Sequence, residues 1–287
     1  MTNIIVLYDN AADEGTLSGG SWILPLTNLQ DPRPTKMARS TDVNPASTKW
    51  RAQLTAANTL RAIVFGPSNF SSGMQYRIRA YSDSAYSSLI NDTGQVTFGA
   101  TPLSTYDMHW ADSNWWSGAQ PLDDPGGAAG IWVIHVYSSD VTAQYWDFEI
   151  DNSSNPDGFI EIGRLFLGSA YIPSLNFEPG SNRAGFVSLT SIQQAVGGAR
   201  YFNRRRAART FQWQHSVLPA DEVHDSIYRL AAIAGTDQQV FIIPAADDTD
   251  RLAKRSFLGT LDEIPSWALE NWGGGSASVG FKVTEVV

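Results

Sequence analysis

Alternation of apolar and polar residues along the chain constrains its fold more than any other feature. Trp50, Ala52 and Leu54 alternate with two polar residues, and because successive side chains of a strand point to opposite faces, this pattern predicts a half-buried strand. The same alternation occurs in residues 74–80, 146–151 and 211–215. Turn-forming residues separate such segments, at 19–20, 66–67, 152–158, 179–180 and 273–275. Many short strands between regular turns predict a mainly all-β protein built as antiparallel sandwiches or barrels.

One segment departs from this pattern. Between residues 219 and 234, Val223, Ile227 and Leu230 fall on one face of a helix, and two carboxylates stand in its first turn. Acidic residues stabilise the amino end of a helix through its dipole. Gly235 follows where a C-terminal cap is expected. The chain therefore predicts one α-helix, followed by a buried strand at residues 240–243.

A change of pattern near residues 174–182 predicts a domain boundary, because prolines and a glycine cluster there without strong periodicity. We expect residues 1–175 to form an antiparallel β-sandwich or jelly roll. Residues 176–287 would form a smaller β domain that carries the α-helix and serves in assembly. The 287 residues suffice for two such cores.

Charge and composition exclude several classes of function. The net charge of −9 gives the chain no electrostatic reason to bind nucleic acid or to enter an anionic membrane. The absence of cysteine excludes disulfides, thiolate catalysis and cysteine-based zinc sites. The apolar run at residues 4–8 has no basic segment before it, so it is expected to form a strand and not a signal peptide. We therefore expect the protein to be synthesised in the cytoplasm.

Residues 26–54 resemble the opening of discoidin-like jelly rolls. The segment Asn28-Leu29-Gln30-Asp31 precedes an exposed loop and then a strand that opens with Trp50. Residues 61–65 and 76–81 would supply the following strands. The chain departs from that family in lacking cysteines that staple the fold. The resemblance implies a module that binds sugars or serves in adhesion.

Residues 159–168, followed by Pro173 and Asn176, resemble a segment of tail proteins of long-tailed bacteriophages. In outline, the order of elements after residue 200 is similar as well. The resemblance implies a distal-tail-like structural subunit of a tail tip or baseplate, present in the virion and assembled in the host cytoplasm. It also implies a trimeric or hexameric ring and other tail proteins as partners, with no cofactor.

An aromatic and acidic loop lies within a long insertion at residues 83–130. Flat rings can stack on pyranoses while carboxylates accept hydrogen bonds from hydroxyl groups, so the loop could bind a cell-surface glycan. The same rings could instead anchor the loop to its own domain or to a neighbouring subunit. The candidate residues are Tyr106, Trp110, Trp115, Trp116, Asp123 and Asp124.

The only dense basic cluster follows residue 199. Arginine forms two-pronged pairs with carboxylates, so a basic cluster in an acidic chain predicts a contact with an acidic patch of a neighbouring subunit. Nucleic-acid binding is less well favoured because no aromatic stacking module accompanies the cluster. The interface candidates are Arg200, Arg204, Arg205, Arg206 and Arg209.

The sequence contains no residue pattern that predicts a catalytic or metal site. Asp147, Glu149 and Asp151 would share one strand face, but no apolar pocket is expected beside them to raise a carboxyl pKa for glycoside cleavage. The acidic loop at residues 245–251 lacks the spacing of a calcium loop, and the four histidines are scattered. We therefore expect no enzyme, no metal and no cofactor. The leading hypothesis is a self-assembling structural subunit, and the alternative is a carbohydrate-binding or host-adhesion module.

Overall fold

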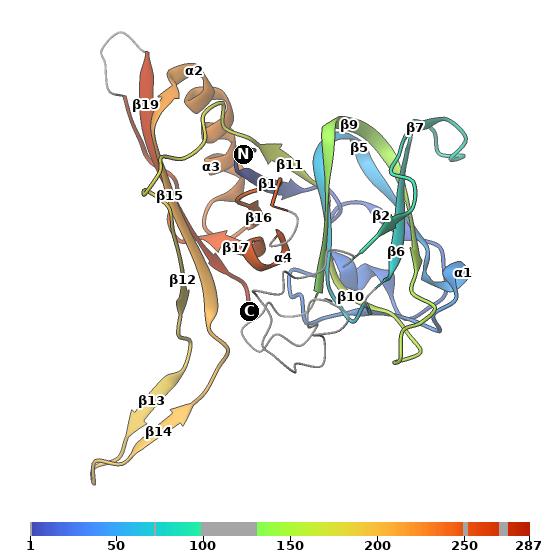
Figure 1. Ribbon diagram of the computed structural model, residues 1–287, viewed down its shortest axis with the longest axis horizontal. Coiled ribbons are helices and arrows are strands. Elements are labelled where there is room, and N and C mark those ends of the chain that lie inside the picture. The colour runs from blue at the N-terminus through green and yellow to red at the C-terminus, as the bar shows by residue number, and fades with distance from the viewer. Residues whose placement is uncertain (1, 72, 99–130, 249–251, 270–274) are drawn as a thin grey trace, which may run out of the picture. The chain divides into compact units, whose positions relative to one another are not determined.

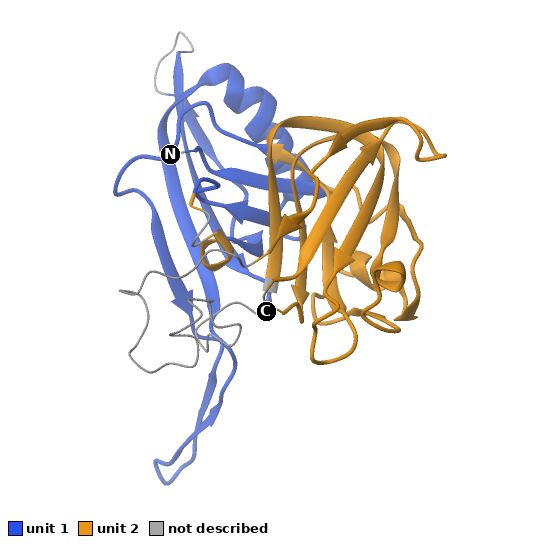
Figure 2. Cartoon of the chain, turned by 45° about the vertical axis from the view of Figure 1, so that its right-hand side comes forward, with its two compact units in different colours: residues 1–9, 171–247, 256–287 blue, residues 10–170, 248–255 orange. Residues whose placement is uncertain are grey.

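The computed structural model describes residues 2–71, 73–98, 131–248, 252–269 and 275–287. The described part of the chain is mainly β, with antiparallel sheets and one longer helix at residues 220–234, which confirms the predicted fold class. It divides into two compact units (Figure 2). Unit 1 comprises Met1–Asp9, Tyr171–Asp247 and Ser256–Val287, and unit 2 comprises Asn10–Ala170 and Asp248–Arg255.

The sheet of unit 1 has the strand order β1-β16-β17-β19-β15-β12, and β18 pairs with β19. On β15, Phe211 and Trp213 are buried while Gln212 and Gln214 are exposed, as the alternation predicts. The Trp213 ring stacks on Phe281 of β19 with centroids 4.9 Å apart. The strands are β1 (Ile5–Asn10), β12 (Arg183–Val187), β15 (Ala208–Pro219), β16 (Gln239–Ile243), β17 (Phe257–Leu261), β18 (Trp267–Leu269) and β19 (Ser276–Glu285).

The predicted helix is confirmed over residues 220–234. It comprises α2 (Ala220–Glu222), a π-helical turn (Val223–Ile227) and α3 (Tyr228–Ala234). Its apolar face joins the core of unit 1. Gly235 caps it by donating its N–H to the Ala231 carbonyl at 3.1 Å. Periodicity alone does not distinguish a π turn from an α turn, so the central turn was not predicted.

The division of the chain differs from the contiguous domains 1–175 and 176–287. Residues 1–9 belong to unit 1, because Ile5, Val6 and Leu7 pair with Ile243, Ile242 and Phe241 of β16. The chain leaves unit 1 after residue 9 and returns after residue 170 through β11 (Gly168–Tyr171). Unit 2 is therefore inserted into unit 1. The short helix α4 (Leu252–Arg255) belongs to unit 2 as well.

Unit 2 consists of one sheet in the order β3-β4-β10-β5-β9-β6-β7, with β2 beside β5 and β8 beside β6. The sheet curves around its own core (Figure 2). Trp50 is fully buried there and stacks on Phe148 at 4.9 Å. The strands are β2 (Thr16–Ser18), β3 (Trp22–Leu24), β4 (Ala38–Ser40), β5 (Trp50–Ser68), β6 (Gln75–Tyr81), β7 (Leu89–Asp92), β8 (Val96–Thr97), β9 (Ile131–Asp151) and β10 (Glu161–Phe166).

Residues 61–65, predicted as a separate strand, belong to the same long strand as Trp50. The strand β5 stays paired with β9 along its length because register shifts between Gln53 and Asn58 and between Leu60 and Ala62 let both strands bend. Two short helices, a 3-10 turn at Leu26–Gln30 and α1 at Pro45–Thr48, connect the strands. No helix among the described residues has the length and apolarity needed to span a bilayer.

Candidate functional site

A hairpin extends from the sheet of unit 1, and we call its residues 183–205 the arm (Figure 1). Its base is β12, which pairs with the first half of β15 from Arg183–Gln212 to Val187–Ala208. Its distal part is a separate two-stranded sheet of β13 (Ser191–Gln194) and β14 (Arg200–Asn203). The arm therefore continues the antiparallel pairing of the sheet past the core that supports it.

All residues of β12, β13 and β14 are exposed. Several of them are large and apolar: Phe186 is 66% exposed, Ile192 59% and Phe202 60%. A two-stranded hairpin without a core is only marginally stable in water, and grouped apolar side chains on a surface mark interaction sites. The arm thus has the properties of a surface that another molecule covers.

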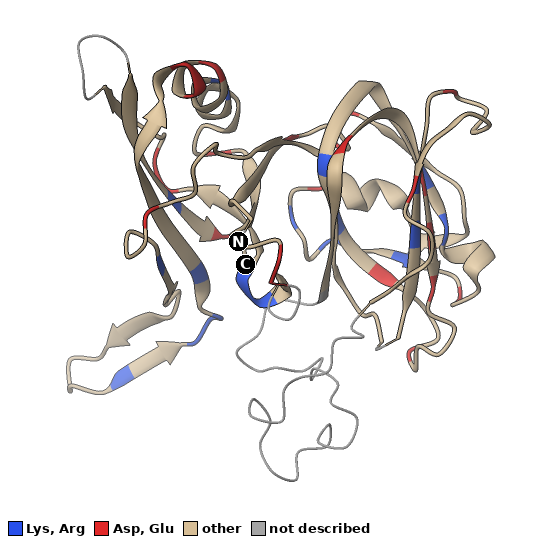
Figure 3. Ribbon diagram, turned by 45° about the horizontal axis from the view of Figure 1, so that its top comes forward, with Lys and Arg blue, Asp and Glu red and all other residues tan. Residues whose placement is uncertain are grey.

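The charge of the arm is opposite to that of the rest of the chain. Arg183, Arg200, Arg204 and Arg205 lie in it, and it contains no carboxylate. Since the whole chain carries −9 and the arm contributes +4, the remaining residues carry −13. Figure 3 shows basic but no acidic segments along the hairpin. An arm of this charge favours an acidic partner surface.

The predicted arginine cluster is divided by the fold. Arg206 and Arg209 turn to Glu285 of β19, at 3.1 Å and 2.7 Å, and Arg209 is buried. The Arg209 guanidinium also donates to the Ser256 carbonyl at 3.1 Å. These two arginines therefore hold β15 to β19, whereas Arg200, Arg204 and Arg205 are exposed on the arm.

Glu285 is ionised in this arrangement for a clear reason. Burial raises the pKa of its carboxyl, but the hydrogen bonds and charge of Arg209, with the charge of Arg206, outweigh that effect and hold the pKa below its usual value. A buried carboxylate that accepts from a guanidinium and a backbone N–H is well satisfied. The contact of Glu285 with Arg209 and Arg206 therefore stabilises the fold. Of the predicted interface residues, only those on the arm remain available to a partner.

The three carboxylates of β9 share one face of unit 2, as the alternation predicts. Asp147 lies opposite Arg79 of β6 and Arg51 of β5. It accepts from the Arg79 guanidinium at 2.6 Å and from the Arg51 guanidinium at 3.2 Å, and Glu149 also pairs with Arg79. Such cross-strand ion pairs occupy the carboxylates with structural contacts.

A polar pocket of about 300 Å³ lies beside these pairs in unit 2. Its lining includes Lys49, Gln75, Gln95, Glu149 and Asp151, and therefore offers both donors and acceptors. A second hollow of about 340 Å³ shares two of these residues, Lys49 and Glu149. Both hollows are lined by residues of β6 and β9, among them charged side chains, and the second also by residues of β5.

The predicted aromatic loop, with Tyr106, Trp110, Trp115, Trp116, Asp123 and Asp124, lies outside the described residues. Its binding role stays a prediction. In the acidic loop, the Asp247 carboxylate accepts from the Thr2 hydroxyl at 3.0 Å and Asp248 pairs with Arg255 at 2.8 Å. Among the described residues, no group of three metal-ligating side chains comes together.

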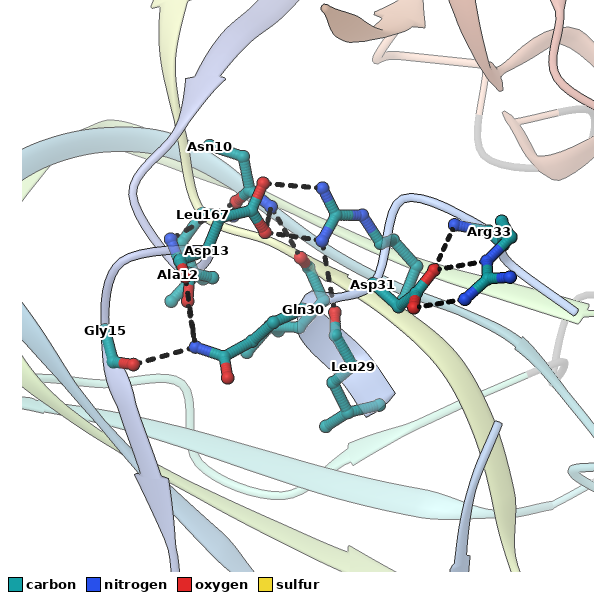
Figure 4. A network of polar contacts seen from close by, with 11 residues as sticks. Asn10, Ala12, Asp13, Gly15, Leu29, Gln30, Asp31, Arg33 and Leu167 are labelled. Atoms are coloured by element: carbon teal, nitrogen blue, oxygen red, sulfur yellow. Dashed lines mark hydrogen bonds and ion pairs between the residues drawn. The ribbon is translucent and has the colours of Figure 1, made fainter. Parts of the chain in front are cut away.

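The two segments that carried the family resemblances meet in one polar network of unit 2 (Figure 4). The buried Arg164 guanidinium of β10 binds the Asp13 carboxylate and donates to the Leu29 carbonyl at 3.3 Å. The Gln30 amide donates to the carbonyls of Ala12 and Gly15, both at 2.7 Å. Both segments therefore have a structural role in joining the loops to the sheet.

No family model matches this chain. The search of curated proteins found no match either. Solved structures with a partial likeness include carbohydrate-binding modules and glycoside hydrolases. A family 32 module of Clostridium perfringens NanJ in complex with galactose is 15% identical and has a TM-score of 0.36, covering 56% of this chain and 96% of its own. A module from a family 31 glycoside hydrolase of the same species is 11% identical with a TM-score of 0.38, covering 56% and 99%.

A third similar structure is the family 32 module of AlyQ with 4,5-unsaturated mannuronic acid. It is 16% identical with a TM-score of 0.33, and the match covers 55% of this chain and 95% of the module. The resemblance to phage tail proteins finds no support in these comparisons and stays a prediction.

Proposed function

We propose that the protein is a non-enzymatic structural subunit that docks onto another subunit through its arm. The observation that carries this proposal is that every residue of β12, β13 and β14 is exposed, and that these strands present apolar and arginine side chains with no carboxylate among them. A surface of this kind gains free energy when a partner covers its rings and pairs its guanidinium groups.

The solution mass of the full chain tests this proposal. Light scattering over a concentration series would compare the protein with a variant in which Asn-Gly replaces residues 188–205. In this variant β12 and β15 are joined by a short turn, and the Arg206–Glu285 pair is kept. We expect the full chain to associate and the shortened chain to remain monomeric. Equal masses at every concentration would contradict the proposal.

A second function, carbohydrate binding by unit 2, is favoured by the polar pocket. One pyranose fits a space of about 300 Å³, and the side chains of Lys49, Gln75 and Asp151 offer the donors and acceptors that sugar hydroxyl groups require. The aromatic loop predicted from the sequence would add rings for stacking. Galactose and an unsaturated mannuronic acid, bound by similar modules, are the first ligands to try.

A glycan array followed by calorimetry tests this second function. Lys49→Ala and Asp151→Ala probe the pocket, and Trp115→Ala with Trp116→Ala probes the loop. Arg33→Ala, an exposed residue of the same unit outside the pocket, is the control. Saturable binding that is lost only in the pocket or loop variants supports sugar recognition. Absence of saturable binding on the array would exclude it for the sugars tested.

A finer form of the proposal places the subunit in the tail tip or baseplate of a long-tailed phage, as a trimer or hexamer that contacts a host glycan. Its ground is the resemblance of residues 159–168, with Pro173 and Asn176, and of the order of elements after residue 200. Mass spectrometry of purified virions from a lysate that contains the protein tests it. Finding the chain in virions at a constant ratio to other tail proteins supports the location, and its confinement to the soluble fraction contradicts it.

A further inference from the structure

We propose that the arm of one copy occupies an apolar groove between α3 and β18 in a second copy of the chain. This inference rests on the proposed assembly function and names the partner surface. Four features of unit 1 carry it: the shape of the groove, its apolar lining, its acidic rim, and its distance from the arm of the same copy.

The groove has a volume of about 620 Å³. Its lining combines small residues of the helix, Ala231 and Ala232, with the larger side chains of Tyr228, Ile264 and Trp267. Tyr228 and Ile264 are 59% and 58% exposed, and the Tyr228 ring meets Trp267 edge to face at 6.2 Å. An open apolar hollow bounded by rings is a place where a partner's side chain inserts.

Two exposed carboxylates are close in the sequence to residues that line this groove. Asp225 is exposed and comes three residues before Tyr228 in the same helical segment. Glu263 directly precedes Ile264 and is exposed. The exposed cation Arg229 also lies on α3, but one residue along a helix turns it by about 100° from Tyr228. The groove thus has an apolar centre and acidic residues close by.

The arm has the complementary arrangement. Its apolar side chains Ile192 and Phe202 are opposite each other in the β13–β14 pair, and Arg200, Arg204 and Arg205 are close to them in the sequence. Apolar burial at the centre of a contact supplies affinity, while charge pairs at the rim fix register and partner choice. A second copy of this acidic chain is therefore a partner of matching chemistry.

The arm and the helical segment α2–α3 lie at opposite ends of unit 1 (Figure 1). The arm joins the first residue of β15, and the helix that lines the groove starts directly after its last residue, Pro219. β18 pairs with β19 at Ala277–Val279, which faces that same end of β15. Twelve residues of strand span roughly 36 Å. The arm consequently binds a neighbouring copy, and the contact is head-to-tail, which closes into a ring or continues as a filament.

A mixing experiment tests the inference. The arm variant carries Ile192→Ser and Phe202→Ser, and the groove variant carries Tyr228→Ser and Ile264→Ser. All four side chains are more than half exposed, so both proteins should keep their fold, as thermal melting would verify. Leu89→Ser with Ile90→Ser, two exposed apolar residues of unit 2, is the matched control.

Each variant alone should associate at least tenfold more weakly than the parent protein, and the control should associate normally. When the two variants are mixed, the intact arm of one meets the intact groove of the other. Sedimentation should then show one-to-one complexes that do not grow further.

A groove variant that assembles like the parent protein, while the arm variant does not, would overturn this inference but leave the assembly function in place. A mixture of the two variants that stays monomeric would overturn it as well, because an intact arm would then fail to bind an intact groove. A parent protein that is monomeric at every concentration would overturn both proposals.

Discussion

Arg164 and Asp13 form a two-pronged ion pair although 151 positions of sequence separate them. The second prong, from Arg164 Nη2 to Asp13 Oδ2, measures 2.7 Å. Arg164 is almost completely buried, so its charge depends on this carboxylate and on the Leu29 carbonyl. The pair therefore couples the first loop of unit 2 to β10, and removing one member leaves the other in a costly environment.

We predict that Asp13→Ala lowers the free energy of unfolding by about 3 kcal/mol, because the buried guanidinium loses its countercharge. Chemical denaturation of the full chain measures this. Glu14→Ala, an exposed neighbour, should change it by less than about 0.5 kcal/mol. The double variant Asp13→Ala with Arg164→Met should recover much of the loss, and equal losses in the single and double variants would contradict the explanation.

Gly163 allows the loop at Pro34 to approach β10. A Cβ added at this position would lie 2.1 Å from the Pro34 carbonyl oxygen, closer than any real contact. Gly163→Ala should therefore cost about 2 kcal/mol or more of stability. Gly280→Ala is the control, since nothing lies within 4 Å of a Cβ there. Equal melting temperatures for the two variants would show that the loop can move away without cost.

The lowered pKa of Glu285 predicts that the folded protein loses stability in acid. Its pKa is lower in the folded protein than the ordinary value of 4.5, so its contribution is complete above about pH 4.5 and falls as the pH drops from there through the folded pKa. Urea denaturation from pH 3 to pH 7 should show this acid loss in the parent protein. In Glu285→Gln the stability near pH 7 is lower and this part of the slope disappears. Glu14→Gln should keep the parent slope.

The lowered pKa of His135 predicts a second pH dependence of stability, in a higher pH range than that of Glu285. Burial lowers its pKa to about 4, and its Nδ1 lies 3.1 Å from the Tyr76 hydroxyl oxygen. Because the unfolded histidine takes up its proton near pH 6.5, the folded state loses stability as the pH falls from about 6.5 to 4. The loss is on the order of 1 to 3 kcal/mol.

An NMR titration of the histidine ring protons measures this directly. The His135 signal should titrate near pH 4. A midpoint near 6.5 for His135 would contradict the burial that the structure shows. His135→Phe should remove this part of the pH dependence of stability.

Part of the candidate site could be predicted from the sequence. The arginines of residues 200–209 were predicted to form an interface because they are the only dense basic cluster of an acidic chain. The exposed apolar residues of the arm, such as Phe186 and Ile192, were missed, since they interrupt any regular alternation. The signal was present, however: large apolar residues without a period are those that no core of their own chain requires.

The sequence by itself determined the strands and the helix, because the alternation at Trp50–Leu54 and the spacing of Val223, Ile227 and Leu230 are local properties of one segment. Only the tertiary structure decided that Ile5–Leu7 pairs with β16, and that Arg209 turns inward to Glu285 while Arg204 stays on the surface. The alternation of apolar and polar residues along a strand shows which of its faces is buried. Which distant strand covers that face depends on packing across the whole chain, which no local pattern contains.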